Sequence, residues 1–133
     1  MRVIVDTNVF ISGIFWQGVT NKILKAWQSK EIKLILNHEI LDEYNRICNK
    51  FSHKLPNINF FPFMELLFIH SEIYPSTKLP KNICRDPDDD KFIACALLAD
   101  VKIIISGDKD LLSINSIQNI EIITPGNFVK KYL

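Results

Sequence analysis

The sequence begins Met1-Arg2-Val3-Ile4-Val5-Asp6-Thr7-Asn8, and this stretch decides the fold. A short run of Val and Ile that ends at polar residues predicts a β-strand buried on both faces. Asp6 then lies at the carboxyl end of that strand. In an open parallel sheet, ligands bind at this edge, where the strand order reverses. The rest of the chain is therefore searched for other acids that reach the same edge.

Composition narrows the class of protein. The chain has 133 residues, 47% of them hydrophobic, and a formal net charge of +1. This predicts one domain over residues 1–133 whose core needs no disulfides. A net charge near zero does not indicate nucleic-acid binding, and it does not exclude a local basic patch. The three cysteines are far apart, which favours a reduced, cytoplasmic protein. We expect no signal peptide and no membrane span, since no apolar run approaches about 20 residues.

The hydrophobic pattern predicts strands that alternate with helices. We expect further strands at 33–37, 69–74, 102–106 and 121–124, and helices at 7–15, 20–29, 38–51, from 56 onward, 89–99, 108–112 and from 125 onward. The segment Phe60–Phe68 is too apolar for a solvated helix, and it faces either the core or a partner subunit. Alternating elements with short connections predict an α/β fold, a three-layer α/β/α sandwich around a central parallel five-stranded sheet.

Two acids stand out in the first half of the chain. Asp6 closes the first strand, where a turn-forming or capping role is the alternative. Glu43 falls within the apolar stripe that Ile40 and Ile47 form on their helix, whereas Asp42 falls on the solvated face. Burying an unpaired carboxylate costs several kcal/mol, so Glu43 needs a cation nearby. Either a metal ion or a salt bridge to a neighbouring base would meet that need.

The second half contributes acids at two more places. Asp88, Asp89 and Asp90 precede an apolar helix, and acids there also stabilise the helix macrodipole. Asp90 is nearest the buried body of that helix, so we predict that it points inward. Asp108 and Asp110 follow the fourth strand, where a turn with a cap is the alternative. Asp6, Glu43, Asp90 and Asp108 are thus predicted to meet at one edge of the sheet.

Carboxylates gathered in this way repel one another unless a cation lies between them. A ligand set made only of oxygen atoms suits Mg²⁺ or Mn²⁺. Such ions neutralise phosphate charge and activate water for attack. The sequence therefore predicts a metal site suited to phosphate ester chemistry.

Four blocks of the chain resemble the PIN-domain nucleases, ribonucleases related to the toxins of bacterial toxin–antitoxin pairs. The blocks are Asp6-Thr7-Asn8, the run from Glu39 to Arg46 around Glu43, the run from Asp90 to Ala96, and Ser106-Gly107-Asp108-Lys109-Asp110-Leu111. The resemblance covers essentially the whole chain. It implies a Mg²⁺- or Mn²⁺-dependent endoribonuclease acting on single-stranded RNA, with Asp6, Glu43, Asp90 and Asp108 as catalytic metal ligands. Some toxins carry Asn in the fourth block, so the division of labour between Asp108 and Asp110 stays open.

The same resemblance implies supporting residues and partners. Thr7, Asn8, Ser106 and Asp110 would bind the carboxylates or the scissile phosphate. Arg85, Lys91 and Lys109 are the nearest bases in sequence for contacts with the RNA backbone. A small antitoxin protein and a second copy of the chain are the expected protein partners. Two alternatives stay open: a phosphatase or phospho-acceptor with Asp6 as nucleophile, and a non-catalytic interaction module that binds metal.

Overall fold

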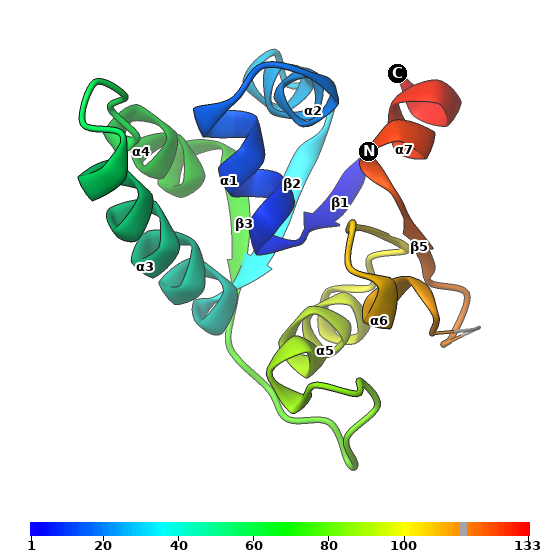
Figure 1. The fold of residues 1–133 in the computed structure, drawn as a ribbon. Helices are drawn as coiled ribbons and strands as arrows, with labels where there is room; N and C mark the ends of the chain where they lie inside the picture. The colour runs from blue at the N-terminus through cyan, green and yellow to red at the C-terminus, as the bar shows by residue number, and fades with distance from the viewer. Residues whose placement is uncertain (115–116) are drawn as a thin grey trace.

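A computed structural model describes residues 1–114 and 117–133. Five parallel strands form one sheet in the order β3-β2-β1-β4-β5 (Figure 1). The strands are β1 (Arg2–Val5), β2 (Lys33–Asn37), β3 (Ser71–Tyr74), β4 (Ile103–Ile105) and β5 (Glu121–Ile123). The first three strands step outward in one direction, and the chain then crosses to the other side of β1. The strand order therefore reverses between β1 and β4, at the carboxyl end of β1.

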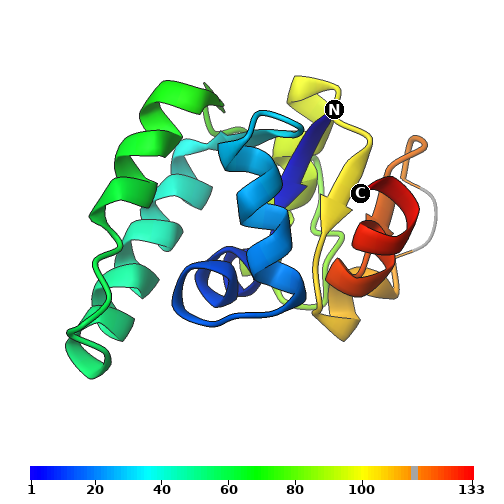
Figure 2. The same cartoon turned by 90° about the horizontal axis from the view of Figure 1, so that it is seen from above.

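Helices cover both faces of this sheet, which confirms the predicted three-layer α/β fold. Helices α1, α2 and α7 lie on one side and α5 on the other (Figure 2). The helices are α1 (Thr7–Phe15), α2 (Val19–Gln28), α3 (His38–Lys54), α4 (Phe61–His70), α5 (Asp90–Ala99), α6 (Lys109–Leu112) and α7 (Pro125–Tyr132), with a 3-10 turn η1 (Pro87–Asp89) before α5. None of the helices in the described ranges combines the length and hydropathy that crossing a bilayer requires.

Strand β1 is central because its side chains are apolar on both faces. Val3, Ile4 and Val5 are fully buried. β1 pairs with β2 on one side and with β4 on the other, with Val5 beside Ile105. The end of β1 is therefore fixed within the core, and so is the position of Asp6, the residue that follows it.

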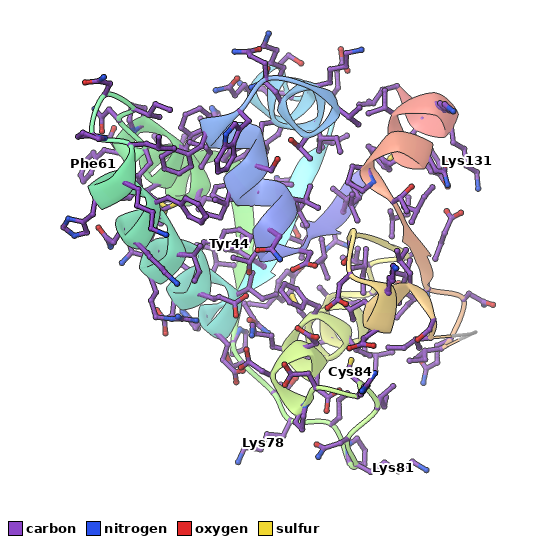
Figure 3. All side chains as sticks on the ribbon, viewed as in Figure 1. Tyr44, Phe61, Lys78, Lys81, Cys84 and Lys131 are labelled. Atoms are coloured by element: carbon purple, nitrogen blue, oxygen red, sulfur yellow. The ribbon has the colours of Figure 1, made fainter. Side chains whose placement is uncertain are left out.

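Helix α1, which follows β1 directly, packs against both α2 and α3. Gly13 leaves room for α2, since a Cβ atom there would lie 2.6 Å from Leu24 Cγ. On the adjoining face, the ring of Phe10 stacks on that of Tyr44 from α3 at 4.2 Å between centroids. The hydroxyl of the buried Tyr44, which is labelled in Figure 3, donates a hydrogen bond to the carbonyl oxygen of Val5. Helix α3 is thereby held against the carboxyl end of β1.

The largest departures from the predicted boundaries surround α4. This helix continues to His70, so β3 begins at Ser71 instead of at residue 69, and the buried Trp27 indole donates to the His70 carbonyl at 3.3 Å. The side of α4 that carries Met64 and Leu67 packs against the core. Its other side is solvent-exposed and carries large apolar side chains, namely Phe61, Phe68 and Ile69 (Phe61 is labelled in Figure 3). The apolar helix therefore faces the core on one side only.

Candidate functional site

Asp6 occupies the switch point between β1 and β4. Its backbone N–H donates to Ile105 at 2.9 Å, and its Oδ2 accepts a hydrogen bond from Ser106 Oγ at 2.6 Å. The residue is only 6% exposed. Burial raises the pKa of Asp6, the Ser106 hydrogen bond lowers it, and the charges of Asp108 and Glu43 raise it further, with a net upward shift. Asp6 is thus a buried acid whose ionised form is destabilised by the charges of nearby acids.

Glu43 projects from α3 toward the start of α1, as its place in the apolar stripe predicted. Its side chain is 16% exposed, whereas the neighbouring Asp42 is exposed. The hydroxyl of Thr7 donates a hydrogen bond to Glu43 Oε2. Arg46 approaches Oε1 at 3.9 Å from the surface. The helix phase therefore separates these two adjacent acids in the way that the sequence indicated.

Lys91 departs from its predicted place. We expected it on the surface as an RNA contact, but its side chain is only 4% exposed. Its Nζ lies 3.0 Å from Glu43 Oε1 and 3.1 Å from Asp88 Oδ2. Burial lowers the pKa of Lys91, but hydrogen bonds to these two acids outweigh burial and raise the pKa above its ordinary value. The prediction is corrected: the helix turns Lys91 inward, where it neutralises acids and cannot reach an RNA backbone.

Asp90 also differs from its expected orientation. Its carboxylate accepts hydrogen bonds from the backbone N–H groups of Cys84 at 2.7 Å and Ile83 at 3.2 Å. These contacts tie the start of α5 to the loop that precedes it. We predicted that Asp90 points inward; in this structure its carboxylate binds the backbone of the loop.

Asp89 is the acid of this run that interacts with Asp108 and Asp6. Its pKa is raised to about 7, first by burial and then by the negative charges of Asp108 and Asp6. The cause is the 3-10 turn η1, which sets a tighter rotation per residue than an α-helix and so changes which of the consecutive acids faces the sheet edge. Sequence reasoning missed Asp89 because three successive acids carry no signal of phase. A recognised 3-10 turn at Pro87 would have supplied that signal.

Asp108, which is half-buried, joins Asp6 and Asp89 from the end of β4. Its Oδ1 accepts from the Asp110 backbone N–H at 2.9 Å, so it caps α6, and its own N–H donates to Ser106 Oγ at 3.0 Å. Asp110 is turned outward, with Oδ1 3.8 Å from Arg85. The two acids of this block are therefore different in kind: Asp108 adjoins Asp6 and Asp89, while Asp110 faces an exposed base.

An open cavity of about 720 Å³ lies beside these acids. Polar side chains from both ends of the chain line it, including Asn8, Ser12, Thr20, Asp108, Lys109 and Asp110. Asn8 and Lys109 are exposed, so both side chains are accessible to a ligand in the cavity. The cavity thus brings predicted substrate contacts together with Asp108, one acid of the group.

The chemistry of these residues fits a divalent cation. Burial raises the pKa of both Asp6 and Asp89; the charge of Asp108 raises both further, and that of Asp6 adds to the shift of Asp89, so a cation would stabilise the charged group. All the side-chain donors are oxygen atoms, the ligands that Mg²⁺ and Mn²⁺ prefer. Within residues 1–114 and 117–133, no three acidic, histidine or cysteine side chains already converge tightly enough to enclose an ion. The acid group therefore suits a divalent cation by its negative charge and by its oxygen donors.

Comparison with known proteins follows the same direction. A family model described as a PIN domain matches residues 2–110. The chain is also 35% identical, over 147 aligned positions, to the uncharacterized protein MJ1680 of Methanocaldococcus jannaschii, an alignment that covers 99% of this chain and 92% of that protein. The matched segment contains Asp6, Glu43, Asp89 and Asp108. The chain belongs to the PIN domain family, whose members are generally nucleases that use divalent metal ions.

Proposed function

We propose that the protein is a Mg²⁺- or Mn²⁺-dependent endoribonuclease that hydrolyses single-stranded RNA, and that it acts in the cytoplasm as the toxin of a toxin–antitoxin pair. The observation that carries this proposal is the group of the buried Asp6 and the half-buried Asp89 and Asp108 at the switch point of the sheet. Glu43 stands beside it on α3. The three aspartates would hold the ion, with Asp89 in the role that the sequence suggested for Asp90.

A bound divalent cation would oppose the charge of the scissile phosphate and activate the attacking water. The chain's own residues then supply orientation. Ser106 holds the Asp6 carboxylate by its 2.6 Å hydrogen bond, and Thr7 holds Glu43. Asp108 accepts the Asp110 amide through Oδ1, so Oδ2 is the atom we assign to orient the water.

The adjoining cavity supports a strand of nucleic acid as the ligand. Its open shape and polar lining suit a flexible, charged chain better than an enclosed small molecule. Asn8 offers an amide to sugar or phosphate, and Lys109 offers an ammonium group to the backbone. Arg85, whose side chain is 87% exposed, stands near Asp110 as a further base. Lys91 is not part of this set.

A protein partner is supported by a different surface. Phe61, Phe68 and Ile69 leave large apolar side chains exposed on α4, and such patches mark sites of protein association. We propose that a small antitoxin covers this surface. Mixing the two proteins and measuring the complex mass by light scattering tests the proposal, and a complex that survives Phe68→Ser unchanged would contradict it.

The central test uses a labelled single-stranded RNA, with a duplex of the same sequence and a DNA strand as controls. Cleavage at internal positions should require Mg²⁺ or Mn²⁺ and should stop when a chelator is added. Asp6→Asn should lose cleavage, whereas Asp100→Asn, which changes an exposed surface acid, should keep it. Hydrolysis of a small phosphate monoester in place of RNA would favour the phosphatase alternative. Intact RNA at saturating Mn²⁺, with Mn²⁺ bound, would favour the interaction module.

A further inference from the structure

Lys91 is a buried cation with all its hydrogen-bonding capacity in use. Its ammonium group donates to the Asp88 carbonyl oxygen at 2.7 Å, and it lies 3.1 Å from Asp88 Oδ2 and 3.0 Å from Glu43 Oε1. An ammonium group has three N–H donors, and these three acceptors match them. The side chain therefore has one preferred position, between α3 and the turn before α5.

Glu43 is held just as fully from its own side. Oε1 faces Lys91, and Oε2 accepts the hydrogen bond from Thr7. The carboxylate is thus neutralised by a charge that belongs to the protein. This distinguishes Glu43 from Asp6 and Asp89, whose pKa values are raised by burial and by the charges of neighbouring acids.

We propose that the Lys91 ammonium is a permanent internal cation that bridges Glu43 and Asp88, so that the acid site takes one divalent ion, among Asp6, Asp89 and Asp108, instead of two. The inference rests on the proposed metal-dependent function. It gives Lys91 a positioning role: it acts through Glu43 and needs no contact with the substrate.

Charge and space explain why the internal cation excludes a second ion. A divalent ion beside Glu43 and Asp88 would need the oxygen atoms that Lys91 now contacts. The two positive charges would also repel strongly at such short range in a partly dehydrated site. A lysine on the rigid body of α5 is present before any metal arrives, so it keeps α3 and α5 in place in the metal-free protein.

The test counts bound Mn²⁺ in the absence of RNA. Titration followed by the electron paramagnetic resonance signal of free Mn²⁺ should give one ion for the wild-type protein. Lys91→Met removes the charge and keeps a long apolar side chain, so Glu43 and Asp88 should recruit a second ion. The matched control is Lys131→Met, which breaks an exposed ion pair to Glu121 of similar length, 2.9 Å, and should leave the count at one (Lys131 is labelled in Figure 3).

Stability supplies a readout that a purely structural lysine would not give. Lys91→Met should melt at a lower temperature than the wild type in chelator and should recover most of that loss in Mn²⁺, because the ion replaces the missing charge. The double variant Glu43→Gln/Lys91→Met removes both members of the pair, so it should fold without metal and bind one ion again.

Several results would overturn the inference. Two ions on the wild-type protein would do so, as would one ion on Lys91→Met together with a melting temperature that Mn²⁺ does not restore. A double variant that binds two ions would also contradict it, even if Lys91→Met fails to fold. Wild-type protein that binds no Mn²⁺ would refute the metal-dependent function itself, so the two failures are distinguishable.

Discussion

Replacing Asp89 by Asn tests which of the consecutive acids faces the site. The substitution removes a negative charge that opposes Asp6 and Asp108 and keeps the shape of the side chain. In metal-free protein we expect Asp89→Asn to raise the melting temperature. We expect added Mn²⁺ to raise the melting temperature of the variant by less than that of the wild type, because the variant has lost a metal ligand.

The size of the effect follows from the pKa of Asp89, which is raised from 3.8 to about 7. A shift of this size corresponds to roughly 4 kcal/mol if nothing screens it. Asp89 is partly exposed, and solvent screening reduces the figure to roughly 1–2 kcal/mol. For a chain of this length, 1 kcal/mol moves the melting temperature by about 3–4 °C. We therefore expect a rise of about 3–8 °C at a pH near 8.

The pH dependence gives the sign independently. Asp89 binds a proton more readily in the folded protein than in the unfolded chain, so its contribution to wild-type stability is complete below pH 3.8 and is lost as the pH rises to about 7. Asparagine does not titrate. The advantage of the variant should therefore be close to zero near pH 4 and largest near pH 8, as calorimetric melting in chelator would measure.

Asp90→Asn is the matched control at the next residue. Both substitutions remove one acid from the start of the same helix, so their effect on the macrodipole is similar. Asp90, however, accepts the amides of Cys84 and Ile83, and weakening these bonds should cost about 1–3 kcal/mol. A stabilised Asp90→Asn and a destabilised Asp89→Asn would refute the reasoning and restore the orientation that the sequence suggested.

Three other predictions concern the frame of the site. Glu43→Gln should lower RNA cleavage by more than about tenfold, while Asp42→Asn on the exposed face should change it little; equal losses in a rate assay would mean that α3 is turned differently. Tyr44→Phe removes the hydroxyl that donates to the Val5 carbonyl and should cost about 1–2 kcal/mol in urea unfolding; an unchanged midpoint would contradict that bond. Gly13→Ala places a Cβ atom 2.6 Å from a carbon of α2, and we expect a loss of about 1–3 kcal/mol by the same measurement, whereas an unchanged value would show that the helices can separate.

The local hydrophobic pattern was sufficient to predict the layers of the fold. Val3, Ile4 and Val5 are apolar on both faces, and such a strand is stable only inside a covered parallel sheet. Asp6 follows that strand directly, so its place at the ligand-binding edge needed no tertiary information. The same holds for Glu43, since the period of an α-helix alone separates it from Asp42.

The boundaries around α4 show where local pattern fails. Phe60–Phe68 is apolar except for Glu65, so no polar stripe indicates which side is buried or where the helix ends. At the end of the helix, the indole of Trp27, far away in sequence, donates a hydrogen bond to the His70 carbonyl. Packing against a distant residue cannot be derived from the segment itself.

What the sequence by itself determined is the parallel sheet, its acidic carboxyl edge and the oxygen-only chemistry found there, because strand and helix periods depend on neighbouring residues alone. Only the tertiary structure decided which acid of the run before α5 faces Asp6, since the 3-10 turn at Pro87–Asp89 shifts the rotation of the chain by an amount that three identical residues cannot reveal. It also decided that Lys91 is buried. The residue type alone does not reveal whether a lysine is exposed or buried. Folding brings the acids of α3 and of the turn before α5 together around Lys91, and these acids make its buried position stable.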